Sequence, residues 1–461
     1  MTAAEATPAI QPETVEKAAH DRAFLGHPKG LGYLAFVEGC ERFSYYSMQT
    51  LLSLYMVNYL LQPTNIGRAI GLPQLGQWLG LSGQPLASQI FGTYTSLVYL
   101  TPILGGIIAD RWLGRRTTLI IGGATMALGH FLMAFEGLFL FALAFLVAGV
   151  GLFKGNIASQ VGELYDEKDR RRATAFQIFY IAINVSVIIA PLISGTLGED
   201  YGWHYGFGAT GVVMVIGLVL YLMAGPWLPA DNRPNRRDPG ARRQPLSGND
   251  WVRIVALLLL MPVLAVALLT NQEIFNAYLI WADQHFQLTF FGKTLPTSWM
   301  ITIDAAFSFS MLVAVAAFWN WYGKTRKEPD ELAKMIIGSL FSMAGGMCLV
   351  IAAATQGAGK IGLFWPVMFH LLNSIAFAHI LPVSLALFSK VAPRQLNATV
   401  MGVYYFAFSI ANMVVGRVGG YYSSWDTVSF WLLHVGSAGV GLLGFAVFRA
   451  AMGKRLAAAQ A

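Results

Sequence analysis

Long apolar stretches alternate with short polar ones along the chain. A helix needs about 20 residues to cross a bilayer core of about 30 Å. These stretches reach that length and are continuously apolar, whereas the strands of a membrane barrel alternate over about 10 residues. We therefore predict an all-α integral membrane protein with twelve transmembrane helices. The predicted helices lie at residues 33–61, 88–109, 117–135, 138–164, 173–197, 205–225, 251–282, 298–322, 332–354, 363–389, 396–421 and 428–448.

The composition leads to the same class. Of the 461 residues, 56% are hydrophobic and 12% are charged. Soluble domains contain about 25% charged residues, so this chain has too few to cover a soluble surface. A disordered chain is excluded by the apolar content, and a disulfide scaffold by the presence of just two cysteines.

Positive charges collect at alternate ends of the predicted helices. With the amino terminus inside the cell, the outer loops contain Arg68, Lys293 and Lys360, and most other lysines and arginines fall on the inner side. Basic loops stay in the cytoplasm. We therefore expect a multi-pass protein of the cell (plasma or inner) membrane with both termini cytoplasmic. This topology accounts for the net charge of +7, so no nucleic-acid partner is required and the lipid bilayer is the expected surroundings.

A proline- and arginine-rich stretch at residues 226–250 divides the predicted helices into two sets of six. Two six-helix bundles are the layout of the major facilitator superfamily, in which substrates bind between the halves near the midplane. The predicted parts are a cytoplasmic amino-terminal segment (1–32), an amino-terminal bundle (33–225), a cytoplasmic linker (226–250), a carboxy-terminal bundle (251–449) and a cytoplasmic tail (450–461).

The loop after the second predicted helix, Gly106–Arg116, resembles the signature loop of that superfamily between helices 2 and 3. The resemblance implies that its charges form ion pairs at a cytoplasmic gate and change partners during transport. These charges belong to Asp110, Arg111, Arg115 and Arg116. The alternative is a loop that only anchors the topology through its positive charge.

Motifs of enzymes are incomplete in this sequence. Gly439, Gly441 and Gly444 have dinucleotide-binding spacing, but they lie in an apolar helix with no preceding strand. Gly359-Lys360 resembles the end of a phosphate-binding loop, but Ile361 follows where a Ser or Thr would bind magnesium. No Cys/His cluster has metal-site spacing. We predict that the protein is not an enzyme and needs no cofactor, so that an ion gradient or the gradient of its substrate supplies the energy.

Charged residues inside predicted membrane helices are the main candidates for function, because burying a charge in the membrane is costly. Glu38 and Arg42 are four residues apart and share a helix face, with Glu41 beside them. Lys154, well inside the fourth predicted helix, is placed to complete the cluster. Two carboxylates and two cations sum to zero, and protonating one carboxylate leaves a positive site for a substrate carboxylate. A structural salt-bridge network is the alternative.

The same residues resemble a known family. The stretch Glu38–Tyr46, which reads EGCERFSYY, is similar to the ExxERFxYY signature of proton-dependent oligopeptide transporters. Further segments similar to signatures of this family are Phe153–Asn156, Phe179–Asn184, Pro382–Pro393 and Met401–Gly402. The resemblance therefore covers most of the chain. It implies proton symport of di- and tripeptides by alternating access, and we expect a monomer.

The resemblance also implies roles for individual residues. Glu38, Glu41 and the helix-7 residue Glu273 would couple protons, while Arg42 and Lys154 would meet the peptide carboxylate. The family lines its peptide site at the positions of Tyr45, Tyr46, Tyr94, Asn184 and Tyr404. For Tyr94, Asn184 and Tyr404, helix packing is the alternative.

The chain departs from the family at several positions. Gln49 stands where a second helix-1 arginine is common, and Phe377 stands where a helix-10 glutamate is expected, with His379 nearby. Asp304 replaces a helix-8 asparagine. We predict that Asp304, together with Glu273, receives the peptide amino terminus; capping the start of helix 8 is the alternative. Packing or interfacial roles are predicted for His130, His370 and His434.

Two other functions stay open at this point. One is proton-coupled uptake of another small anion, such as nitrate or a carboxylate, on the same scaffold. Asp304 and Glu273 argue against it, because additional acids repel an anion but attract an amino terminus. The other is a nutrient sensor that does not transport, although such sensors usually append a signalling domain or a long tail.

Overall fold

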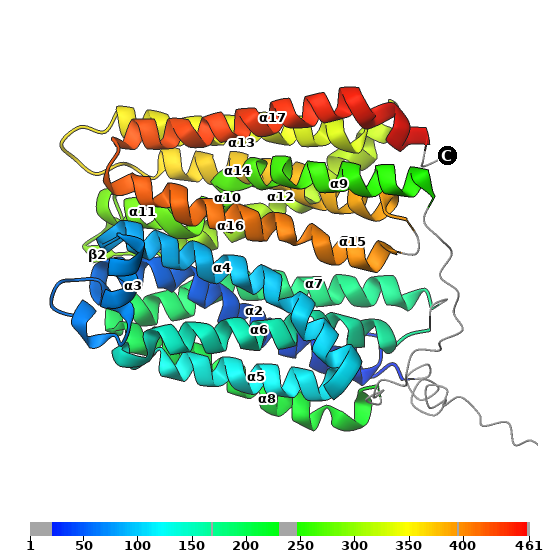
Figure 1. The fold of residues 1–461 in the computed structure, drawn as a ribbon, viewed down its shortest axis with the longest axis horizontal. Helices are drawn as coiled ribbons and strands as arrows, with labels where there is room; N and C mark the ends of the chain where they lie inside the picture. The colour runs from blue at the N-terminus through cyan, green and yellow to red at the C-terminus, as the bar shows by residue number, and fades with distance from the viewer. Residues whose placement is uncertain (1–20, 167–168, 230–246, 394–395, 459–461) are drawn as a thin grey trace, which may run out of the picture. The chain divides into compact units, whose positions relative to one another are not determined.

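The computed structural model describes residues 21–166, 169–229, 247–393 and 396–458, and nearly all of them are helical (Figure 1). Ten helical segments of these residues are long and apolar enough to cross a membrane. Two further helices match the other predicted runs. They are α2 (Lys29–Tyr55), which carries the predicted charge cluster, and α5 (Arg115–Leu132), which begins with two arginines.

The other elements follow the predicted order. They are η1 (Met56–Leu60), η2 (Ile66–Arg68), α3 (Leu72–Leu79), α4 (Gly83–Ile108), η3 (Ala109–Leu113), η4 (Glu136–Leu138), α6 (Phe139–Glu163), α7 (Arg171–Ala190), η5 (Pro191–Gly195), η6 (Leu197–Tyr201), α8 (Trp203–Met223), η7 (Gly225–Trp227), α9 (Gly248–Ala267), α10 (Leu269–Glu273), η8 (Ile274–Tyr278), α11 (Leu279–His285), β1 (Thr289–Phe290), β2 (Lys293–Thr294), α12 (Trp299–Gly323), α13 (Glu331–Ala354), α14 (Phe364–Val391), α15 (Asn397–Tyr404), α16 (Phe406–Gly419), η10 (Gly420–Ser423) and α17 (Thr427–Ala458). Strands β1 and β2 form one antiparallel pair. Most of the predicted 226–250 linker lies outside the described residues.

The described residues form two compact units that alternate along the chain. The first unit takes its residues from Met1–Met48, Thr101–Ala190 and His204–Gly240, and the second from Gln49–Leu100, Pro191–Trp203 and Ala241–Ala461. The boundary between the units falls inside α2 and α4, and again where α7 continues as the π-helical segment η5. The predicted division into two six-helix bundles stays a proposal.

In the first unit, α4 and α6 approach closely through glycines. A Cβ atom added to Gly105 would lie 1.9 Å from the carbonyl oxygen of Gly151. Small residues of this kind let membrane helices pack backbone to backbone. Since Gly151 precedes Lys154 by one helical turn, this contact fixes the part of α6 that carries the predicted site lysine.

Replacing Gly105 by valine is expected to destabilise the protein by about 1–3 kcal/mol or more, because the added atoms overlap the α6 backbone. Gly106→Val is a matched control, since a Cβ at Gly106 would meet nothing within 4 Å. Thermal unfolding of both variants in detergent tests this expectation. Equal melting temperatures for the two variants would show that the close approach of α4 and α6 does not limit stability.

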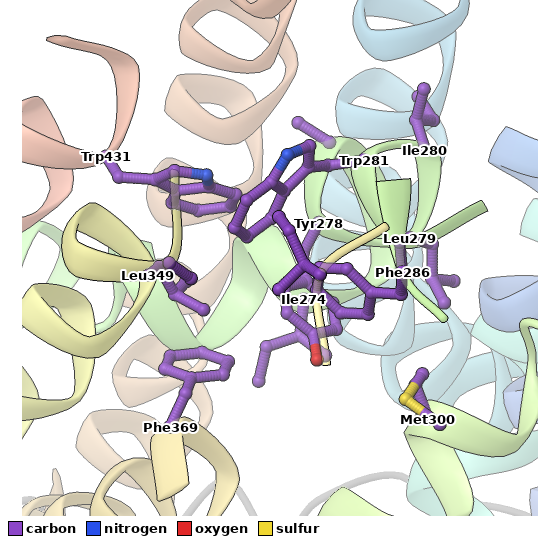
Figure 2. Close-up of a cluster of buried hydrophobic side chains, with 14 of the residues drawn as sticks. Ile274, Tyr278, Leu279, Ile280, Trp281, Phe286, Met300, Leu349, Phe369 and Trp431 are labelled. Carbon is purple, nitrogen blue, oxygen red and sulfur yellow. The ribbon is translucent and has the colours of Figure 1, made fainter. Parts of the chain in front are cut away.

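The second unit contains an aromatic core around the end of α11. Trp281 packs on Trp431 with ring centroids 5.2 Å apart, and on Phe286 at 4.9 Å (Figure 2). Tyr278 is fully buried in the same cluster, against Phe369 of α14. These large rings hold Tyr278 and the neighbouring turn of α14 in place, and both contribute to the site described below.

The seventh predicted helix, 251–282, is interrupted rather than continuous. It consists of α9, α10, η8 and α11, and Asn276 has the non-helical angles φ −120° and ψ −106°. At the break, the carboxylate of Glu273 accepts a hydrogen bond from the backbone N–H of Ala277 at 3.2 Å. Because helix interruptions in a membrane must satisfy their freed backbone groups, Glu273 has a structural role in addition to any transport role.

Candidate functional site

The charge cluster of α2 is assembled and buried in the first unit. Arg42 Nε lies 3.2 Å from Glu38 Oε1, one helical turn away, and Arg42 also forms an ion pair with Glu41. The exposed fractions are 5% for Glu38, 0% for Glu41 and 5% for Arg42. The i,i+4 spacing on one helix therefore brings these charges together, as the sequence predicts.

Two aromatic side chains extend this cluster along α2. The ring centroid of Tyr45 lies 5.2 Å from Arg42 Cζ and 5.3 Å from Lys154 Nζ, so both cations lie near the same ring. Tyr46 packs edge-on against Tyr45 at 5.1 Å. A ring face attracts cations, and this attraction strengthens when water is excluded. Tyr45 thus brings the two cations predicted to meet a carboxylate into one site.

The carboxylates of this cluster have oxygen atoms available for a proton. Among the described residues, no hydrogen bond reaches Glu38 Oε2 or Glu41 Oε1, although both atoms are buried. A proton on either oxygen would break no hydrogen bond to a protein donor. It would also remove a buried negative charge, and a low-dielectric site disfavours such a charge. The cluster can therefore gain one positive charge by taking up a proton on an oxygen atom that carries no hydrogen bond.

Two further polar contacts belong to the first unit. The hydroxyl of Ser44 hydrogen-bonds His130 Nε2, which ties α2 to α5. Asn184 donates to the carbonyl of Tyr180 in its own helix at 2.8 Å. His130 was predicted to have a packing role, and its hydrogen bond to the charge-bearing helix is an addition to that expectation.

In the second unit, Glu273 lies against a histidine. Its Oε2 is 3.5 Å from His434 Nε2 of α17, while its Oε1 accepts from Asn276 Nδ2 at 2.9 Å. Both Glu273 and His434 are fully buried. His434 therefore packs directly against the predicted coupling acid, within ion-pair distance of its carboxylate.

Asp304 has a histidine partner as well. Its Oδ1 lies 2.9 Å from His370 Nδ1, and His370 Nε2 lies 2.7 Å from the hydroxyl of Tyr278. Asp304 is the sixth residue of α12, whose N-cap position is Ser298, so Asp304 does not cap this helix. The role of Asp304 at a peptide amino terminus stays a prediction. His370, for which we predicted packing, fixes the position of the Asp304 carboxylate.

The other predicted aromatics of the site also lie in the second unit. Tyr94 is buried in α4, and Tyr404 is buried with its hydroxyl 2.9 Å from Ser384 Oγ. His379 lies two residues after Phe377, which stands where the family has a glutamate. Its ring accepts a hydrogen bond from Trp319 Nε1 at 3.1 Å and also bonds the carbonyl of Ile375. These contacts identify the partners of Tyr404 and His379, and both alternatives for Tyr404, peptide site or helix packing, stay predictions.

The loop predicted to form a gate is π-helical at η3 and turns at Gly114, which has φ +78°. Arg115 forms an ion pair with Glu163 at the end of α6 and lies 3.7 Å from Asp110. Arg111 is exposed, and Arg116 packs against Gly225. Glu163 is an ion-pair partner that the sequence did not identify. Among the described residues, no group of three or more His, Cys, Asp or Glu is placed to hold a metal ion.

Comparison with known families decides the fold. Residues 35–416 match the sequence model of the family described as Major Facilitator Superfamily. The chain belongs to the major facilitator superfamily. The predicted all-α membrane fold is thereby confirmed, and so is the expectation of a multi-pass transporter rather than an enzyme.

Several relatives within the superfamily are similar over nearly the whole chain. A peptide transporter of Yersinia enterocolitica is 29% identical over 87% of this chain and 89% of its own length. A di-/tripeptide transporter of Lactococcus lactis is 27% identical over 90% of this chain and 93% of its own length. A point mutant of the peptide transporter POT, solved with sulfate, has a TM-score of 0.84 and 25% identity, with 98% of this chain and 99% of that chain covered. The predicted resemblance to oligopeptide transporters is confirmed.

Proposed function

We propose that this protein is a symporter that imports di- and tripeptides together with protons by alternating access. The observation that carries the proposal is the cluster around Tyr45, in which Glu38, Glu41 and Arg42 are buried and Lys154 is half-buried. It places two acids that can take a proton beside two cations that can bind a carboxylate. Peptide transport by the relatives named above supports the proposal.

In this proposal, each charged end of the peptide binds side chains of opposite charge. Arg42 and Lys154 bind the peptide carboxylate, and Tyr45, Tyr46 and Asn184 line the same part of the site. Glu273 and Asp304 attract the amino terminus, and Tyr94 and Tyr404 are assigned to the peptide site as aromatic side chains. Protons enter on Glu38, Glu41 and Glu273, and Asp110 with its neighbouring arginines forms the cytoplasmic gate.

The proposed setting is the cell membrane, with both termini cytoplasmic and the protein acting as a monomer. Protons serve as the coupling ion and no cofactor takes part. A proton moving down about 100 mV releases about 2.3 kcal/mol, which supports roughly 50-fold accumulation of a neutral solute. A zwitterionic peptide is neutral overall and therefore suits this driving force.

Uptake of labelled dialanine into proteoliposomes tests the proposal against the anion alternative. An inward proton gradient should drive accumulation, and unlabelled dipeptides should compete, whereas excess nitrate or succinate should not. Competition by nitrate or succinate but not by dipeptides would favour uptake of a small anion. We expect selectivity for peptides because Asp304 and Glu273, which are both buried in the second unit, would repel an anion but attract an amino terminus.

Asp304→Asn should weaken binding of free dipeptides roughly tenfold, because a charge-assisted hydrogen bond to the ammonium group is lost. Amino-acetylated dipeptides, which lack that charge, should be affected much less. Competition against labelled dialanine measures both affinities. If the preference for free over acetylated dipeptides is unchanged, Asp304 does not meet the amino terminus and serves to hold His370 and Tyr278.

A further inference from the structure

A carboxylate from the end of the fifth membrane helix binds the start of α12. The side chain of Glu199 in η6 accepts hydrogen bonds from the backbone N–H groups of Thr297 at 2.6 Å and Ser298 at 2.9 Å. Thr297 and Ser298 directly precede the first turn of this 25-residue helix, where the helix dipole is positive. The interaction joins a segment that continues from α7 to a helix of the carboxy-terminal half.

The contact around Glu199 is tight and extends to a second acid. A Cβ atom on Gly195 would lie 1.9 Å from Ser298 Oγ, and Trp299 Nε1 donates to Thr196 at 3.0 Å. Asp283 of α11 accepts from the Thr297 hydroxyl at 2.8 Å and from Asn58 Nδ2 of η1 at 2.9 Å. Thr297 thus binds both carboxylates, one through its backbone and one through its side chain.

The charges around Glu199 make it sensitive to protons. Its hydrogen-bond donors, which belong to Thr297 and Ser298, are all uncharged, and Asp283 adds a second negative charge nearby. The other nearby acid, Asp200, is exposed on the same segment. A hydrogen bond to an ionised acceptor is about twice as strong as a neutral one. Neutralising Glu199 therefore weakens its attachment to α12 and relieves its repulsion by Asp283.

We propose that Glu199 is a further proton-binding residue of the transporter, whose ionised carboxylate holds the outer end of the protein closed. With the amino terminus cytoplasmic, α2 ends on the outer side, and so does the segment that contains Glu199. A proton from outside then releases α12 and lets the outer end open where protons are abundant. This inference rests on the proposed proton-driven alternating access and adds a residue to it.

Cysteine labelling from the outside tests this inference without any peptide. Ser194→Cys introduces a small, fully buried thiol five residues before Glu199, and the native Cys40 and Cys348 are both buried. Its reaction with a membrane-impermeant maleimide reports opening of the outer end. Because thiol reactivity itself rises with pH, each rate is compared between variants at the same external pH.

Glu199→Gln, introduced into the Ser194→Cys protein, mimics the protonated carboxyl group. We expect it to react at least about tenfold faster than the Ser194→Cys protein near pH 8. The two rates should converge as the external pH is lowered, because the Glu199 carboxylate of the Ser194→Cys protein then takes up a proton and becomes neutral like the amide. Asp200→Asn is the matched control and should leave the rate unchanged.

Three results would overturn the inference, each read from the ratio of the labelling rate with Glu199→Gln to the rate without it. A ratio of one at both high and low pH means that Glu199 does not hold the outer end. A raised ratio that does not depend on pH means that the substitution only loosens the structure. An equal effect of Asp200→Asn means that surface charge explains the result. A failure here leaves peptide uptake to be judged separately, because the labelling assay contains no peptide.

Discussion

Glu41→Gln is expected to abolish accumulation of peptide against a gradient while leaving exchange of peptide across the membrane. Glu41 is fully buried and ion-paired to Arg42. The amide permanently removes the negative charge, as protonation would, so the variant can bind and exchange a peptide but cannot release a proton to reset the cycle. Uptake of labelled dialanine with an inward proton gradient should fall to the level of protein-free vesicles.

Counterflow in the same vesicles is the internal control for folding. Preloading with unlabelled dialanine should still draw in labelled dialanine through the Glu41→Gln protein. Arg42 keeps its ion pair with Glu38, so the site is expected to stay assembled. If the variant accumulates dialanine at the normal rate under a proton gradient, Glu41 does not couple protons.

Lys154→Ala is expected to lower the affinity for free dipeptides about 10- to 150-fold. A buried hydrogen bond between charged groups contributes about 1.5–3 kcal/mol, and each 1.4 kcal/mol corresponds to a factor of ten. Lys154 lies with Arg42 near the Tyr45 ring, where a peptide carboxylate would return the cluster to zero net charge once one glutamate is protonated. Dipeptides with an amidated carboxy terminus lack that charge and should lose much less affinity.

Competition against labelled dialanine measures this difference between free and amidated peptides. Lys154→Arg keeps the positive charge and should retain part of the preference for free peptides, which separates charge from packing. Equal losses for free and amidated peptides in Lys154→Ala would mean that Lys154 supports the structure of the site rather than binding the carboxylate.

The sequence predicts the helices well because the bilayer sets their length. A run of about 20 apolar residues has few alternatives to a membrane helix. The ion pair of Glu38 and Arg42 is equally predictable, since residues four apart on a helix are neighbours. The interruption at Asn276 is not, because it depends on Glu273 and on the packing of distant helices around it.

The histidine partners of Asp304 and Glu273 could not be predicted from sequence spacing. Asp304 and His370 are 66 residues apart, and Glu273 and His434 are on helices separated by most of the carboxy-terminal half. No local spacing signals either pair. The same holds for Glu199, whose partners Thr297 and Ser298 lie about a hundred residues later. Contacts of this kind depend on how helices pack and become visible in the folded chain.

The most direct measurement of proton-coupled peptide import uses a peptide gradient as the sole driving force. Proteoliposomes with a trapped pH-sensitive dye are prepared with equal pH on both sides and no membrane potential, and dialanine is then added outside. The proposed symport predicts that the interior becomes acidic as dialanine enters, and that Glu41→Gln vesicles show no such acidification. Entry of dialanine into wild-type vesicles without any change in internal pH would contradict proton-coupled import.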